Sequence, residues 1–468
     1  MKVKAINRSA DDWSRERSQD LRKVHRNLDP ALHPFEKAVE VKRALSAVKL
    51  AKGVFAKPFL AALALDDGVT CLARSPARLN ALVAGCADGT LSAWDVAGRR
   101  RLRRFVGHRG AVTGVAVAPA GDALVSTSAD GTARLFALPF APPAGHGVVD
   151  RDAPALLEFA VPAGASGGAG LAARAGGAGA ALRGVDHHPT RSAFATAGAA
   201  VHLWDHARAA PVRSLAWGAD GVTAVRYSPA EPDLLAGCGG DRSVTLYDVR
   251  VGGPVRKVIM QTRANAVSWN PMEPLNFTVA SEDACCYTFD LRRLDAAACV
   301  HKDFVSAVMD VDWSPTGREF VAGGYDRTVR LFAAGAGHAR EAYHTTRMQR
   351  VFATRFSGDG AYVYSGSDDM NVRLWKADAS AQLGTLLPRE KHKQAYDKAL
   401  IARYRHIPEV GRIAREVHLP KAVKKAHKLA RASEDADARK LRRRVSHSAP
   451  GSVEVKPARR KKIVAELE

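Results

Sequence analysis

The sequence lacks an apolar run long enough to cross a membrane, and its first residues lack the apolar segment of a secretory signal. Its cysteines lack the paired spacing of a disulfide framework or a metal site: they are Cys71, Cys86, Cys238, Cys285, Cys286 and Cys299. Adjacent residues such as His187 and His188 would point to opposite faces of a strand and would chelate poorly. We therefore expect an intracellular chain with reduced cysteines and no metal ligands.

Signatures of catalysis and of nucleotide binding are also missing. An Ala/Gly tract from Gly164 to Gly179 has neither the flanking strand and helix nor the Lys-Ser/Thr pair of a phosphate-binding loop. It has no apolar periodicity, so we interpret it as a flexible loop inserted at about residues 160–181. No nucleophile stands in a recognisable pattern with a base. We predict no catalytic residue, no cofactor and no small-molecule substrate, and hence a protein that is not an enzyme.

What the sequence does contain is a repeat, marked by aromatic residues. Apart from one interval they recur at about 42 to 43 residues, the period of a β-propeller blade, at Trp94, Phe136, Trp204, Tyr247, Phe289, Phe332 and Trp375. An aspartate stands six residues before all but one of them, at Asp88, Asp130, Asp241, Asp283, Asp326 and Asp369. We predict an all-β, seven-bladed propeller in which these aspartates are structural turn residues that accept hydrogen bonds.

The repeats resemble the WD-repeat family, because Trp94, Trp204, Tyr247 and Phe289 are each followed by Asp and because Gly107-His108 precedes the second repeat. We place the propeller at residues 54–388. The apolar segment Phe55 to Leu63 precedes the first repeat, and we expect it to supply the outer strand that closes the last blade.

Positive charge is concentrated at the two ends of the chain. Residues 1–53 hold 13 Lys and Arg against 7 Asp and Glu, and residues 389–468 hold 23 against 10, which leaves about +3 of the total +22 for the propeller. Basic extensions on a nearly neutral scaffold indicate phosphate binding, with a solvated nuclear-import signal as the alternative. The candidate RNA or particle contacts are Lys421, Lys424, Lys425, Lys428, Arg442, Arg443 and Arg444.

The C-terminal extension divides by its sequence pattern. Apolar residues at helical spacing favour helices over residues 389–430, with breaks at Pro408 and Pro420. Periodicity fades beyond that point, so we interpret residues 431–468 as a basic disordered tail and residues 1–53 as a basic N-terminal extension.

Phrases outside the repeats resemble one eukaryotic family, the Sof-type (suppressor of fibrillarin) WD-repeat proteins. They include RNLDPALHPFE at residues 26–36, FAKPF at 55–59, PREK at 388–391, HIPEV at 406–410 and HLPK at 418–421. This resemblance covers nearly the whole chain outside the Ala/Gly loop and the last few dozen residues. It implies a nuclear, nucleolar assembly factor of the small-subunit processome, whose partners are precursor rRNA, the U3 small nucleolar ribonucleoprotein and other processome proteins, with no membrane.

Part of that family carries a second role, as substrate receptor of a cullin-RING ubiquitin ligase. Its motif ends in aromatic-Asp-x-Arg, which occurs here at Tyr247 to Arg250 and at Phe289 to Arg292, without the Trp of the strict form. Arg250 and Arg292 are thus candidate contacts for the ligase adaptor. The alternative is that each arginine pairs with a carboxylate inside its own blade.

Overall fold

The computed structural model describes residues 30–32, 34–52, 56–138, 153–161, 181–217, 220–449 and 451–467. The chain divides into two compact units. One, called here the helical unit, comprises Met1–Pro58 with Asp378–His418, and the other, the propeller unit, comprises Phe59–Ala377 with Leu419–Glu468. Most of the insertion expected at about residues 160–181 lies outside the described residues.

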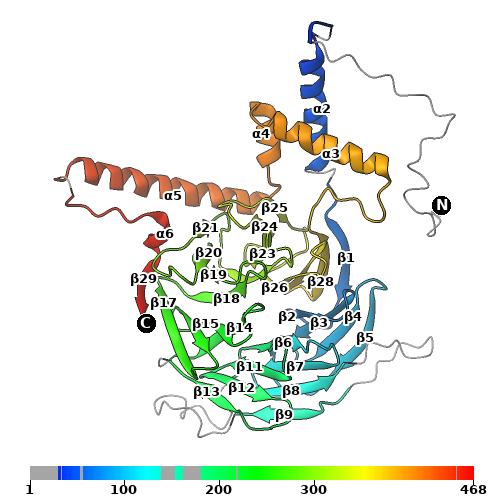
Figure 1. The fold of residues 1–468 in the computed structure, drawn as a ribbon, viewed down its shortest axis with the longest axis vertical. Helices are drawn as coiled ribbons and strands as arrows, with labels where there is room; N and C mark the ends of the chain where they lie inside the picture. The colour runs from blue at the N-terminus through cyan, green and yellow to red at the C-terminus, as the bar shows by residue number, and fades with distance from the viewer. Residues whose placement is uncertain are drawn as a thin grey trace, which may run out of the picture. The chain divides into compact units, whose positions relative to one another are not determined.

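The propeller unit contains seven sheets in the described residues, and Figure 1 shows them as a ring of blades. The innermost strands β2, β6, β10, β14, β18, β22 and β26 each contact the next, and β26 contacts β2, so the ring closes. The predicted seven-bladed propeller is therefore confirmed. Closure leaves only short strand edges at the rim.

The strands of blades 1 to 3 are β2 (Val69–Arg74), β3 (Ala81–Cys86), β4 (Leu91–Asp95), β5 (Arg100–Phe105), β6 (Val112–Val117), β7 (Ala123–Ser128), β8 (Thr132–Ala137), β9 (Leu157–Ala160), β10 (Gly184–His187), β11 (Ala193–Ala197), β12 (Val201–Asp205) and β13 (Arg213–Leu215). Blades 4 and 5 hold β14 (Val222–Tyr227), β15 (Leu234–Gly239), β16 (Ser243–Asp248), β17 (Gly253–Met260), β18 (Ala264–Trp269), β19 (Asn276–Ser281), β20 (Cys286–Asp290) and β21 (Cys299–His301). Blades 6 and 7 hold β22 (Val308–Trp313), β23 (Glu319–Gly324), β24 (Val329–Ala333), β25 (Glu341–Tyr343), β26 (Val351–Phe356), β27 (Tyr362–Ser367) and β28 (Asn371–Lys376).

The last blade is closed by the start of the propeller sequence. β1 (Phe59–Ala64) pairs antiparallel with β28, with Leu63 opposite Val372, and completes blade 7 as its outer strand. This confirms the closing strand expected from the segment Phe55 to Leu63. Joining the first segment to the last blade ties the two ends of the ring together without a covalent bond.

The repeated aromatic residues form the core between blades. All seven are at most 8% exposed, and Phe332 of blade 6 shares a cluster with Cys286 of blade 5 and Trp313 of blade 6. Burying a side chain of this size stabilises the fold by about 1.5–3 kcal/mol. The period of the aromatics in the sequence is thus the period of the blade interfaces in space.

Innermost strands also form hydrogen bonds from one blade to the next. The Asp186 carboxylate accepts the Tyr227 amide at 2.7 Å, and Asp312 accepts the Phe356 amide at 2.8 Å. The partners stand roughly one repeat period apart in sequence. These bonds satisfy backbone amides of the inner strands, which are buried around the channel.

The helical unit joins the segments that precede and follow the blades in sequence. α2 (Glu36–Ala51) follows the short 3-10 turn η1 (Pro30–Leu32) and packs against α3 (Pro388–Arg403) and α4 (Pro408–Arg415). Ala44 and Val48 of α2 share a core with Leu400 and Val410. The Tyr404 hydroxyl donates to Glu40. Helix α2 of the predicted N-terminal extension and part of the predicted helical region therefore form one core, because each supplies only one apolar face.

The prediction of a disordered tail is wrong over most of residues 431–468. Helix α5 (Lys421–Ser446) continues through the first half, and α6 (Ala458–Lys461) and β29 (Ile463–Leu467) follow. β29 adds a fifth strand to blade 4 by pairing with β17, as Figure 1 shows. The tail is ordered by an edge that lies some 200 residues away in sequence, which its own composition could not indicate. The helix breaks expected at Pro408 and Pro420 are present, since α4 begins at Pro408 and α5 follows Pro420.

In the described residues no helix is long and apolar enough to span a membrane. All six cysteines are free thiols. Burial raises the pKa of the Cys71, Cys86 and Cys238 thiols to about 12, so these cysteines stay protonated and act as small apolar core residues.

Candidate functional site

The turn aspartates lie in the tight turns between the second and third strands of their blades. The first carboxylate oxygen accepts the backbone amide two residues ahead in five of the six blades, at 2.9 to 3.2 Å, from Thr90, Thr132, Ser243, Cys285 and Thr328. The residue after each aspartate has a positive φ, and it is glycine only at Gly89 and Gly131. The aspartate therefore stabilises a left-handed turn residue that would otherwise be strained.

The second carboxylate oxygen binds a different partner in each of five blades. The partners are His108 for Asp130, Lys257 for Asp241, Tyr287 for Asp283, Arg330 for Asp326 and Arg373 for Asp369. The Asp326 and Arg330 side chains are each only 2% exposed. Tyr287, Arg330 and Arg373 lie on the strand that follows the turn, and Lys257 lies on the outer strand of its blade, so these pairs fix the turn within its blade, which is a structural role.

The pair in blade 2 resembles a catalytic dyad in composition but not in surroundings. His108 Nδ1 lies 3.1 Å from Asp130, and His108 Nε2 lies 2.7 Å from the buried Ser126 hydroxyl. Burial lowers the pKa of His108, so the ring is neutral and acts as a bridge between strands. Burial opposes ionisation of Asp130, but hydrogen bonds from Thr132, the Arg109 amide and His108 outweigh it and lower the pKa of Asp130 to about 2.

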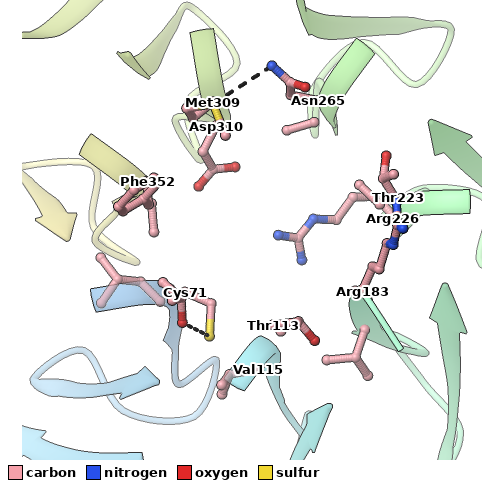
Figure 2. Close-up of a pocket in the computed structure, with 18 of the residues that line it drawn as sticks. Cys71, Thr113, Val115, Arg183, Thr223, Arg226, Asn265, Met309, Asp310 and Phe352 are labelled. Atoms are coloured by element: carbon pink, nitrogen blue, oxygen red, sulfur yellow. Dashed lines mark hydrogen bonds between the residues drawn. The ribbon is translucent and has the colours of Figure 1, made fainter. Parts of the chain in front are cut away.

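The central channel of the propeller holds a cavity of about 130 Å³. Figure 2 shows the Arg226 guanidinium of blade 4 and the Asp310 carboxylate of blade 6 pointing into this cavity. Asp310 accepts the Thr354 amide at 2.8 Å and Arg355 Nη1 at 3.0 Å, and Arg226 Nη1 lies 3.3 Å from Asp186. Burial raises the pKa of the Asp310 carboxyl to about 7, while the charge of Arg226 acts in the opposite direction. No sequence pattern predicted this ion network, which joins inner strands of different blades.

The candidate RNA contacts lie on α5. Because a helix advances 100° per residue, Lys421, Lys424, Lys425 and Lys428 share one face, and Arg442 and Arg443 return to it after the intervening turns. Arg444 lies about 100° further round and does not belong to this face. We call these six side chains the basic face of α5. All six residues are exposed, and they span about 33 Å along the helix axis.

The basic face has little internal neutralisation. In the part of the chain that the structure describes, no ion pair involves its six side chains, although Asp435 lies on the same side of the helix. The pair that α5 does form, Lys440 with Asp437 at 3.6 Å, lies off this face. Only Val423 of the helix is buried. A helix so polar around its circumference owes little to packing and is suited to binding a partner of opposite charge.

Arg250 and Arg292 occupy equivalent positions at the ends of β16 and β20. Arg250 pairs with Asp248 at 3.0 Å and Arg292 pairs with Asp290 at 2.8 Å, each within its own blade. Hydrogen bonding to the arginine is the main cause that lowers the pKa of Asp248 and of Asp290. Both arginine side chains are nevertheless 70% exposed. They are held in place locally and remain accessible to a partner.

Among the described residues, no group of three or more His, Cys, Asp or Glu side chains is arranged to hold a metal ion. The adjacent His187 and His188 side chains contact different residues, as expected when neighbouring residues of a strand point to opposite faces. His187 Nε2 lies 3.1 Å from His206 Nε2, whereas His188 Nδ1 accepts the Thr190 and Arg191 amides.

Comparison with protein families gives matches to both parts of the chain. A Sof1-like domain matches residues 377–463, and the WD domain, G-beta repeat, matches residues 63–95, 99–136, 298–332 and 343–376. DDB1- and CUL4-associated factor 13 of Danio rerio is 43% identical over 469 residues, covering 100% of both chains. The chain belongs to the Sof1-like family of WD-repeat proteins.

Further relatives extend this relationship across eukaryotes. The Homo sapiens DDB1- and CUL4-associated factor 13 is 41% identical over 468 residues, covering 99% of each chain. Protein SOF1 of Saccharomyces cerevisiae is 41% identical over 442 residues, covering 92% of this chain and 88% of its own length. The resemblance inferred from the phrases outside the repeats is confirmed. It extends further than expected, because the Sof1-like match includes α5 and α6 and ends at residue 463, within β29.

Proposed function

We propose that this Sof1-like protein is a non-catalytic ribosome-assembly factor of the nucleolar small-subunit processome, which scaffolds protein and RNA contacts for 18S precursor rRNA processing. The observation that carries the proposal is the basic face of α5, an exposed and unpaired set of cations on a protein whose propeller is nearly neutral. The 41% identity to Protein SOF1 supports the same assignment.

The chemistry of the basic face fits an RNA backbone. Ammonium and guanidinium groups along 33 Å of one helix face neutralise successive phosphates, and the release of counterions supplies the binding free energy. These side chains are all exposed, and phosphate contacts of this kind carry no base specificity. The expected ligand is therefore the phosphate backbone of precursor rRNA or of the U3 small nucleolar RNA, with other processome proteins bound by the propeller.

The experiment that tests this proposal is crosslinking of the protein to RNA in cells, with the attached sequences read out. We expect reads from the small-subunit rRNA precursor and from the U3 RNA, and a nucleolar location by microscopy. Reads distributed evenly over cellular RNA, with no enrichment of these two, would contradict the proposal.

A second candidate function is substrate receptor of a cullin-RING ubiquitin ligase. Two observations favour it: the relatives named DDB1- and CUL4-associated factor 13, and the exposed Arg250 and Arg292. Each guanidinium is oriented by an aspartate two residues before it and keeps most of its surface free to bind an acidic partner.

This second function is tested by the affinity of the purified protein for DDB1. The double variant Arg250→Ala with Arg292→Ala should lose at least about tenfold in affinity if both arginines lie in the interface. Arg208→Ala is the matched control, because Arg208 is an exposed arginine shortly after the third strand of blade 3. An affinity of the double variant equal to that of the control would remove these arginines from the interface.

A further inference from the structure

The C-terminal residues after α5 dock on the rim of the propeller as an added strand. β29 runs antiparallel to β17, with Lys257 opposite Leu467 and Ile259 opposite Ala465. β17 is eight residues long, whereas the outer strands of blades 5 and 6 have three residues each. Blade 4 therefore presents a longer edge of backbone donors and acceptors, which a further strand can pair with.

The preceding helical turn extends this contact to blade 5. The Ala297 amide donates to the Arg459 carbonyl at 3.1 Å, and the Gln261 amide donates to the Lys462 carbonyl at 2.9 Å. Arg460 forms an ion pair with Asp295. Blades 4 and 5 thus contact one continuous segment, a helical turn and the strand after it, through backbone amides and a carboxylate.

Side chains define which segment fits this edge. Ile463 packs against the core cluster that includes Val258 and Met260, while Val464 points outward and is 63% exposed. Glu466 lies 3.7 Å from Arg256, whose guanidinium also donates to the Leu291 carbonyl at 3.2 Å. The recognised pattern is a basic residue for Asp295, an apolar residue at the position of Ile463 and an acidic residue three positions later.

The contacts that hold β29 are few, and several are exposed. The Arg460 and Asp295 side chains are 57% and 48% exposed, and exposed ion pairs contribute little. The segment is tethered to the propeller unit through α5, so its effective concentration at the edge is on the order of millimolar. A tethered ligand of this kind stays bound through weak contacts and yet exchanges with an untethered segment of the same pattern.

We propose that the outer edge of β17, together with Asp295 and Ala297 just before β21, is a strand-binding site for a segment of a partner protein that forms a helical turn followed by an extended strand. The partner segment carries the basic, apolar and acidic residues of residues 460–466 and binds by β-augmentation, displacing the chain's own terminus. The C-terminal strand of this protein is the resident occupant, and its displacement releases the C-terminal anchor of α5.

The test uses the full-length protein and a labelled synthetic peptide with the sequence of residues 457–468. Ile463→Asp in the protein should undock its own terminus, because a carboxylate would face the apolar cluster. Val464→Asp is the matched control, since Val464 points to solvent. We expect the peptide to bind the Ile463→Asp protein at least about tenfold more tightly than the wild type or the control protein.

Hydrogen exchange gives an independent measure of occupancy. The amides of Gln261 and Ala297 donate to the docked terminus, so their exchange should accelerate at least about tenfold in the Ile463→Asp protein. Excess peptide should restore the protection, whereas a peptide carrying the Ile463→Asp change should not.

Three outcomes would overturn the proposal. Unchanged exchange in the Ile463→Asp protein would mean that the terminus does not occupy this edge in solution. Failure of the peptide to bind that protein at about 1 mM would mean that the edge accepts only a tethered strand. A wild-type dimer that becomes monomeric in the Ile463→Asp protein would identify the occupant as the terminus of a second copy.

Discussion

Four lysines of α5 give the sharpest test of the RNA-binding proposal: Lys421, Lys424, Lys425 and Lys428. All are exposed on the basic face, so their replacement by Ala should leave the fold intact and remove phosphate contacts alone. Each contact to single-stranded RNA adds about 0.7 to the slope of log affinity against log salt. If all four bind phosphates, the slope falls by about 2.8, which corresponds to a loss of about 600-fold at 0.1 M salt and about 30-fold at 0.3 M.

The assay is fluorescence anisotropy with a labelled RNA from the small-subunit rRNA precursor, titrated at several salt concentrations. A matched control replaces four exposed basic residues of α3 by Ala, namely Arg389, Lys391, Lys393 and Lys398, and so removes the same charge elsewhere. We expect the control to keep the wild-type slope to within about one contact. Equal slopes for the wild type and the α5 variant would refute the assignment, and equal losses in both variants would show that net charge alone attracts the RNA.

Three further predictions concern the propeller. Deleting residues 389–468 should leave the β-sheet circular dichroism signal in place, because the blades carry their own core, but should abolish cosedimentation with pre-ribosomal particles; normal cosedimentation would make the tail dispensable. Asp326→Ala should lower the free energy of unfolding, measured in urea, by about 3–5 kcal/mol, because it leaves the buried Arg330 guanidinium without its carboxylate partner. The exposed Asp88→Ala should lower the free energy of unfolding by only about 1 kcal/mol. The pKa of Asp130 in the folded protein, about 2, lies below its ordinary value of 3.8, so the stabilisation by this carboxylate is present above about pH 4 and is lost as the pH falls towards 2. Asp130→Asn should therefore flatten the dependence of the unfolding free energy on pH between about pH 4 and about pH 2. An unchanged pH dependence in this window would contradict the lowered pKa.

The blades could be predicted from the sequence, because their signals are local. A turn aspartate and the residue after it act within a few positions of each other, and the aromatic that follows packs at every repeat against the neighbouring blade. A spacing of one blade period therefore predicts both the number of blades and the register of each turn. The closing strand was also predictable, since the apolar segment before the first repeat had only the last blade to complete.

The packing of the segments before and after the blades could not be predicted from the sequence, because it depends on contacts between distant parts of the chain. α2 and α4 are separated by more than 350 residues, yet they share one core. The apolar spacing of each helix predicts a buried face but does not indicate which other helix covers it. The segment Ile463–Leu467 forms a strand because it pairs with the edge of β17. The charged residues around this segment predicted disorder, since they give no indication of that edge. The carboxylates and guanidiniums of the channel meet only after the ring closes. In each case the deciding free energy comes from a contact between distant parts of the chain, which periodicity and composition do not encode.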